Sequence, residues 1–92
     1  MKQEHKAYHI IVKGRVQHIG FRFWTECKAI KFNIKGFVKN SKDENMVELE
    51  VEGASDRIES FLYSIEHEHP YARIDSFEKT MIEEKGYKDF KI

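Results

Sequence analysis

Three apolar residues alternate with three glutamates in residues 46–52, and this period of two constrains the fold more than any other feature of the chain. Val47, Leu49 and Val51 project to one side of an extended strand, and the glutamates project to the other side. A strand of this kind has one face in the core and the other in water. We therefore expect a sheet with one solvated face.

The opposite face requires a cover, and residues 21–33 can supply it because their apolar side chains recur at helical spacing. Two neighbouring stripes are present: Phe21, Thr25, Ala29 and Phe32 in one, and Phe23, Cys27 and Ile30 in the other. An apolar surface this wide predicts a helix packed on the sheet, with Cys27 as a small buried group. Asn33 is expected to end the helix in the left-handed conformation.

A second helix is predicted after Gly53. Ser55 can cap its N-terminus, and Asp56 suits the positive end of the helix dipole. One apolar face follows, formed by Ile58, Phe61, Leu62 and Ile65. Pro70 disfavours helical geometry in the residue before it, so the helix should end before this proline.

The remaining segments rich in β-branched and aromatic residues predict strands at residues 8–13, 34–40, 73–81 and 87–92, the last of them short. Polar residues 41–45 form a hairpin loop, in which Asn45 can supply a left-handed turn residue. Imperfect alternation in the strand after Pro70 indicates a bulge.

This order of elements, β-α-β-β-α-β with a short tail, is that of an α+β, ferredoxin-like split βαβ sandwich with two helices on one face of an antiparallel sheet. A chain of 92 residues is large enough for one two-layer core. We expect residues 1–92 to form a single domain.

Residues 14–22 lie between the first strand and the first helix and are the candidate binding site. Gly14 and Gly20 flank a turn that gathers unpaired backbone N–H groups at the positive end of a helix dipole. Such a turn suits an anion. Arg22, in the first helical turn, adds a planar fork of donors.

This stretch, Gly-Arg-Val-Gln-His-Ile-Gly-Phe-Arg, resembles the acylphosphatase signature Gly-Arg-Val-Gln-Gly-Val-Gly-Phe-Arg, and residues 36–40 resemble the second motif of that family. The similarity extends over nearly the whole chain. It implies that Arg22 binds phosphate and that Asn40 positions a water molecule. It also implies a phosphate cradle made by the backbone of Arg15, Val16, Gln17, His18, Ile19 and Gly20.

The resemblance implies hydrolysis of a small-molecule acyl phosphate to a carboxylate and inorganic phosphate. The leaving carboxylate is stable near neutral pH, so the reaction requires positioning and charge compensation and needs no general acid, metal or cofactor. His18 and Ile19 stand where the family usually has Gly and Val, and residues 43–47 are one residue longer than the corresponding hairpin. If position 18 needs a positive φ, His18 introduces strain.

Two alternatives remain open. One is an acylphosphatase-like module that binds phosphorylated ligands or a protein partner without turnover. The other is an RNA-recognition domain, because such domains share this strand order. Glu48, Glu50 and Glu52 argue against RNA, because they occupy the face on which those domains present aromatic and basic residues.

Charge is distributed unevenly along the chain, with a net +8 in residues 1–42 and −8 in the remainder. A basic half containing the candidate turn favours a small anionic ligand, whereas the zero total argues against broad nucleic-acid binding. Residues 66–69 are the densest histidine cluster. We interpret them as a solvated run of charged side chains rather than a set of metal ligands, because two histidines two residues apart do not share a helical face. No apolar segment suits a membrane span or a signal core, so we expect a cytoplasmic monomer without a membrane partner.

Overall fold

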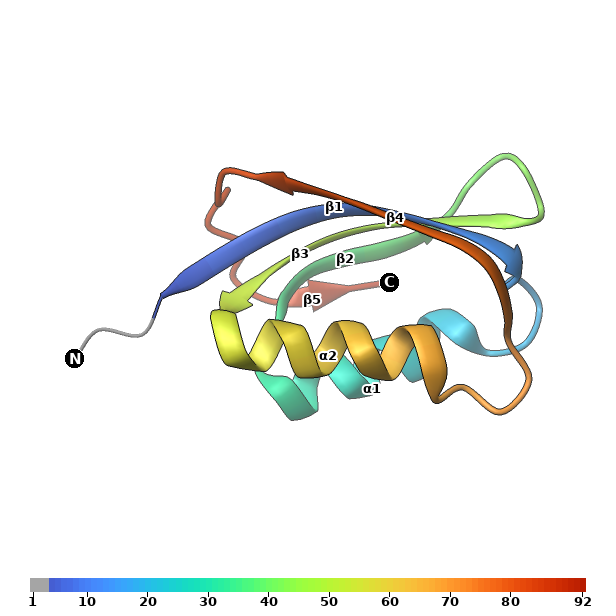
Figure 1. Cartoon of the computed structure of the whole chain (residues 1–92), viewed down its shortest axis with the longest axis horizontal. Coiled ribbons are helices and arrows are strands. Elements are labelled where there is room, and N and C mark those ends of the chain that lie inside the picture. Colours follow the sequence, from blue (N-terminus) through green and yellow to red (C-terminus); the bar gives the residue numbers. More distant parts are fainter. Residues whose placement is uncertain (1–3) are drawn as a thin grey trace.

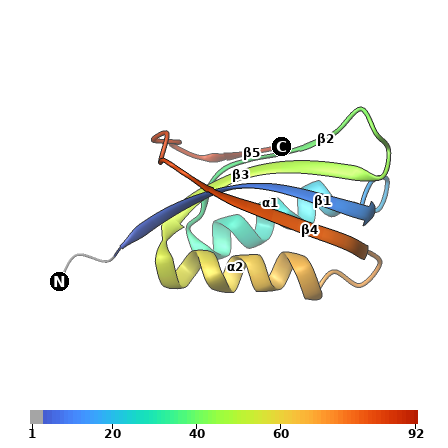
Figure 2. The same cartoon turned by 45° about the horizontal axis from the view of Figure 1, so that its top comes forward.

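Five strands form one sheet in the order β4-β1-β3-β2-β5, and two helices cover one of its faces (Figure 1; Figure 2). The computed structural model describes residues 4–92. The expectation that the chain has no signal core also concerns residues 1–3, which lie outside the described residues. The elements are β1 (His5–Arg15), α1 (Phe21–Phe32), β2 (Lys35–Asn40), β3 (Met46–Ala54), α2 (Ser55–His67), β4 (Arg73–Ile82) and β5 (Phe90–Lys91). The predicted α+β, ferredoxin-like class is confirmed.

The sheet is mixed, and the expectation of a wholly antiparallel sheet is wrong at one edge. Strands β1 to β4 pair antiparallel, but β5 pairs parallel with β2. The segment between β4 and β5 reverses the chain direction and brings it to the opposite edge of the sheet (Figure 1). Since β4 and β2 run in opposite directions, a strand that reverses after β4 must run with β2.

Strand β3 confirms the alternation on its apolar side. Val47, Leu49 and Val51 are buried in the core between the sheet and the helices. On the other side the prediction fails at Glu52, which is only 6% exposed. Its carboxylate accepts hydrogen bonds from the backbone N–H groups of Lys85 at 2.8 Å and Tyr87 at 2.6 Å, so the segment that leads to β5 covers it.

Helix α1 buries one of its two predicted apolar stripes. Phe21, Thr25 and Ala29 face the core, and Asn33 caps the helix at φ 58°, as expected. The prediction that the second stripe is buried is wrong, because Phe23 and Ile30 are 65% and 71% exposed and Cys27 is also exposed. A two-layer fold places the sheet on only one side of α1, so the second stripe faces outward.

Helix α2 confirms the predicted face of Ile58, Phe61, Leu62 and Ile65 and ends before Pro70. Its N-terminal cap differs from the prediction. Ala54 is the cap and makes no side-chain hydrogen bond, while Ser55 is already the first helical residue.

Of two further local predictions, one is wrong and one is confirmed. Among residues 4–92, only His18 and Asn33 combine a side chain with a positive φ, so Asn45 is not left-handed. The register of the β1–β4 pair shifts once: Lys13 pairs with Ser76 and Gly14 with Ile74, which leaves Asp75 of β4 as the extra residue, so the bulge predicted in the strand after Pro70 is confirmed. A Cβ atom on Gly14 would lie 2.0 Å from the carbonyl oxygen of Arg73, so β4 can approach β1 here only because the residue is glycine.

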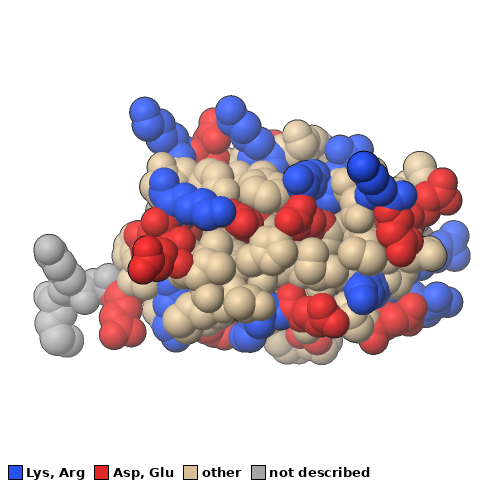
Figure 3. All heavy atoms as spheres, turned by 90° about the horizontal axis from the view of Figure 1, so that it is seen from above, with Lys and Arg blue, Asp and Glu red and all other residues tan. Residues whose placement is uncertain are grey.

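Acidic and basic side chains that are separated in the sequence lie side by side in the fold. The open face of the sheet in Figure 3 shows charges of both signs. Glu48 contacts His9 of β1 at 2.6 Å and Lys39 of β2 at 3.2 Å. Glu50 contacts Lys85 at 2.6 Å, a pair within the acidic part of the chain. Pairing β3 with β1 and β2 therefore brings the acidic part of the chain against the basic part. In the described part of the chain, no helix has the length and apolar character to cross a membrane.

Candidate active site

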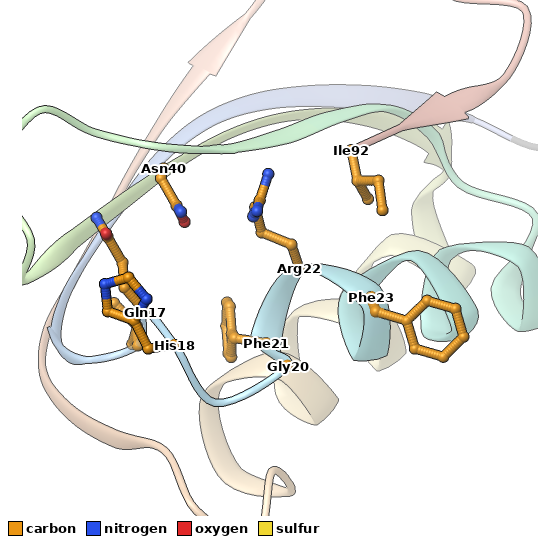
Figure 4. Close-up of a pocket in the computed structure, with 9 residues that line it drawn as sticks. Gln17, His18, Gly20, Phe21, Arg22, Phe23, Asn40 and Ile92 are labelled. Carbon is orange, nitrogen blue, oxygen red and sulfur yellow. The ribbon is translucent and has the colours of Figure 1, made fainter.

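A pocket of about 270 Å³ lies where the loop after β1 enters α1 (Figure 4). Its lining combines residues from both predicted motifs: Val16, Gln17, His18, Gly20, Phe21, Arg22, Phe23, Asn40 and Ile92. Arg22 projects from the first turn of α1, and Asn40 is the last residue of β2. The fold therefore brings the predicted arginine and the predicted asparagine to one cavity.

Two predicted cradle residues, Arg15 and Ile19, are not part of the pocket lining. Arg15 ends β1, is exposed and pairs with Arg73 of β4. Ile19 is partly buried and packs against the core. The side chain of Ile19 thus anchors the loop to the core, and that of Arg15 remains at the surface.

The loop passes through the left-handed region at both His18, with φ 64°, and Gly20, with φ 75°. Glycine adopts this conformation without a steric penalty, whereas a side chain at such a position stores strain of order 1 kcal/mol. Position 18 therefore does adopt a positive φ, and His18 introduces strain there. His18 lines the pocket in a backbone conformation better suited to glycine.

The N-terminus of α1 is open toward an anion. Gly20 is its cap residue, offers no side-chain cap hydrogen bond, and is followed by a first turn without an acidic residue. The N–H groups of a first helical turn have no partner within the helix and carry the positive end of the dipole. Arg22 adds a positive side chain to the same end.

Gln17 has a role that sequence reasoning missed, since only its backbone was assigned to the cradle. Its side-chain Nε2 donates toward the main-chain carbonyls of Met46 at 2.8 Å, Asp43 at 2.9 Å and Ser41 at 3.3 Å. These carbonyls belong to the β2–β3 hairpin that begins immediately after Asn40. The amide therefore links the two halves of the pocket, a contact between distant segments that no local pattern in the sequence indicates.

His69 packs against two aromatic residues at the start of α1. Its ring lies edge-on to Trp24 at 5.0 Å and tilted against Phe21 at 5.7 Å, between ring centroids. Nδ1 accepts hydrogen bonds from the backbone N–H groups of Tyr71 and Ala72, both at 3.1 Å. Burial against these rings lowers the pKa of the His69 imidazole and so favours the neutral form.

His67, the other histidine of residues 66–69, lies in a different environment. The ring of His67 lies tilted against Tyr63 at 4.7 Å between ring centroids, and His67 contacts Glu66 at 3.7 Å. Within residues 4–92, no group of three or more His, Cys, Asp or Glu side chains is arranged to hold a metal ion. Glu66, His67 and Glu68 are exposed, as the interpretation of a solvated run requires, but His69 is half-buried against aromatic rings, so the interpretation is wrong for that residue.

The fold and the pocket together define a ferredoxin-like α+β domain with an anion-suited loop at the start of its first helix. The sequence profile of the Acylphosphatase family matches residues 8–92. The chain belongs to the acylphosphatase family.

Individual relatives agree with this membership. The acylphosphatase of Treponema denticola is 45% identical over 91 residues, which cover 99% of this chain and 96% of the relative. The crystal structure of acylphosphatase from Bacillus subtilis superposes with a TM-score of 0.88 at 33% identity, covering 95% of this chain and 97% of that one. Full-length HypF, crystallised in its phosphate- and nucleotide-bound form, matches at a TM-score of 0.90 and 36% identity; 99% of this chain aligns with 12% of that protein.

Proposed function

We propose that this protein is an acylphosphatase that hydrolyses the carboxyl–phosphate bond of acyl phosphates in the pocket between α1 and the end of β2. The observation that carries the proposal is the presence of Arg22 and Asn40 in one pocket, beside a loop that opens onto the N-terminus of a helix. A positive side chain, an uncharged amide and free helix N–H groups are the components that phosphoryl transfer to water requires.

Phosphate binding is assigned to Arg22 and to the backbone of residues 15–20. The guanidinium forms charge-assisted hydrogen bonds with phosphoryl oxygens, and the backbone N–H groups bind the remaining oxygens without carrying a titratable charge. Because the first turn of α1 contains no acidic residue, no carboxylate of that turn opposes the incoming dianion.

Asn40 is assigned to the attacking water. Its amide oxygen can accept a hydrogen bond from the water, and its amide nitrogen can donate one, so the side chain orients the water without changing its own charge. The water oxygen forms a bond to phosphorus, and the bond from phosphorus to the acyl oxygen breaks. The carboxylate leaves with the electron pair, and the proton lost by the water remains on inorganic phosphate. The leaving group is already a weak base, so this scheme uses no general acid, metal or covalent intermediate.

The decisive measurement is the release of inorganic phosphate from acetyl phosphate and benzoyl phosphate by the purified protein in the presence of EDTA. We expect turnover well above the spontaneous rate, unchanged by the chelator and by added Mg²⁺. Activity that disappeared with EDTA would contradict the metal-free scheme.

A phosphate-binding module without turnover is the second candidate, and the left-handed His18 is the observation that favours it. A strained residue in the loop could hold the N–H groups away from the geometry of the transition state while phosphate still binds. Binding of inorganic phosphate by calorimetry, with no hydrolysis of either acyl phosphate, would support this candidate instead.

A further inference from the structure

Two large apolar side chains lie exposed at one side of the pocket. Phe23 is 65% exposed and Ile92 is 53% exposed, and both belong to the pocket lining. In Figure 4, Arg22 lies between these two side chains and Asn40. The pocket therefore has a polar side at Asn40 and an apolar side at Phe23 and Ile92.

The core does not account for the apolar residue at position 23. Helix α1 faces the core with Phe21, Thr25 and Ala29, and Phe23 lies off that face. Water is a poor neighbour for an exposed aromatic ring, so a ligand that covers the ring gains from its burial. Phe23 differs in this respect from Ile30, which is 71% exposed on the same helix but does not line the pocket.

The direction of the reaction indicates which part of the substrate meets this side. In phosphoryl transfer the attacking and leaving oxygens are roughly in line with the phosphorus atom between them. This step rests on the proposed function, in which Asn40 holds the attacking water and Arg22 binds the phosphoryl group. The leaving carboxylate then departs away from Asn40, toward Phe23 and Ile92.

We propose that Phe23 and Ile92 contact the acyl group of the substrate and make the enzyme selective for acyl phosphates with an aromatic or branched aliphatic acyl group. Neither side chain carries a charge or donates a hydrogen bond. A short acyl group such as acetyl is too small to cover both side chains and gains little from them. The phosphoryl group makes the same contacts in either substrate.

The test compares the steady-state kinetics of wild type and Phe23→Ala with benzoyl phosphate and with acetyl phosphate, and measures inhibition by inorganic phosphate. The contact is made in the ground state and the transition state alike, so its loss should raise KM for benzoyl phosphate about fivefold to tenfold and leave kcat nearly unchanged. KM for acetyl phosphate and the inhibition constant for inorganic phosphate should stay within about twofold, since neither ligand reaches Phe23. Ile92→Ala should shift KM for benzoyl phosphate in the same direction by a smaller factor.

Ile30→Ala is the matched control, because it removes an exposed apolar side chain from the same helix outside the pocket. It should change neither substrate's KM. Phe23→Leu retains an apolar contact and should recover most of the benzoyl phosphate affinity, which separates selectivity from any fraying of α1 in Phe23→Ala.

Equal changes with both substrates, or no change with benzoyl phosphate, would overturn the selectivity inference and leave the proposed function standing. A wild-type protein that hydrolyses neither acyl phosphate would overturn the proposed function, and the inference with it. The wild-type measurement is made first, so the two failures are distinguishable.

Discussion

The side-chain amide of Gln17 donates to the main-chain carbonyl of Met46 over 2.8 Å and thereby ties the loop before α1 to the first residue of β3. The same nitrogen also reaches the carbonyls of Asp43 and Ser41. An amide nitrogen has two N–H donors, so three carbonyls share them. The position of Asn40 relative to the loop thus depends on a side chain that belongs to the loop itself.

Gln17→Glu should impair the site more than Gln17→Ala. Alanine removes the hydrogen bonds, and we expect the free energy of unfolding to fall by about 1–2 kcal/mol. Glutamate places a negative charge against carbonyl oxygens and should lower kcat/KM for acetyl phosphate by about tenfold more than alanine does. Denaturation curves and steady-state kinetics measure the two effects. Equal kinetics for wild type and both variants would show that the hairpin holds its place without Gln17.

Arg22 and Asn40 should separate in their kinetic effects. Arg22→Ala removes the positive donor to the phosphoryl group, so we expect weaker inhibition by inorganic phosphate and a fall in kcat/KM of about 10³-fold. Asn40→Ala should lower kcat about 10²-fold and leave inhibition by phosphate nearly unchanged, since the amide acts on water.

Asn45→Ala is the control for the Asn40 variant, because it changes an asparagine in the adjacent hairpin that does not line the pocket. It should retain the wild-type kcat. If Asn40→Ala kept the wild-type kcat as well, the assignment of the attacking water to Asn40 would be wrong.

His18→Gly should relieve strain and preserve or raise activity. Glycine accepts φ 64° at no steric cost, so the free energy of unfolding should increase by about 0.5–1 kcal/mol, reduced by the greater freedom of glycine in the unfolded chain. Thermal denaturation and hydrolysis of acetyl phosphate measure the two outcomes. A collapse of activity with retained stability would show that the imidazole contributes to the reaction.

Most of the fold could be predicted from the sequence because periodicity reports which side of an element is buried. The alternation around Leu49 and the helical spacing of Ile58 to Ile65 identified the two layers and the core. The same signal failed for Phe23 and Ile30, since an apolar stripe does not reveal whether a second layer is available to cover it. It failed for Glu52 because the covering segment is distant in the chain and contributes only backbone N–H groups.

The two predicted side chains of the site could be assigned by resemblance to a family, and the structure places both in one pocket. The side-chain role of Gln17 and the position of Ile92 could not be predicted. Each depends on contacts between segments far apart in sequence, which neither spacing nor a short motif encodes.

His69 should make the fold less stable in mild acid. Its pKa in the folded protein is lowered by burial, so the neutral imidazole is the form that the fold prefers. In the unfolded chain a histidine takes up a proton near pH 6.5, as an unperturbed imidazole does. The stabilisation is therefore complete above about pH 6.5 and is lost as the pH falls from there through the lower pKa of the folded state. Protonation of Nδ1 would also break the two hydrogen bonds that this nitrogen accepts from the backbone N–H groups of Tyr71 and Ala72.

Urea denaturation at pH 7.5 and pH 5.0 measures this effect, with His69→Asn as the comparison. The amide oxygen of asparagine can accept the same backbone hydrogen bonds but does not titrate. Wild type should lose more stability than His69→Asn between the two pH values, and the difference reports His69 alone because the other histidines are common to both proteins. Since His69 packs against Phe21 and Trp24, the loss should appear first as weaker packing at the start of α1, the element that carries Arg22. An equal loss in both proteins would place the acid sensitivity at another group.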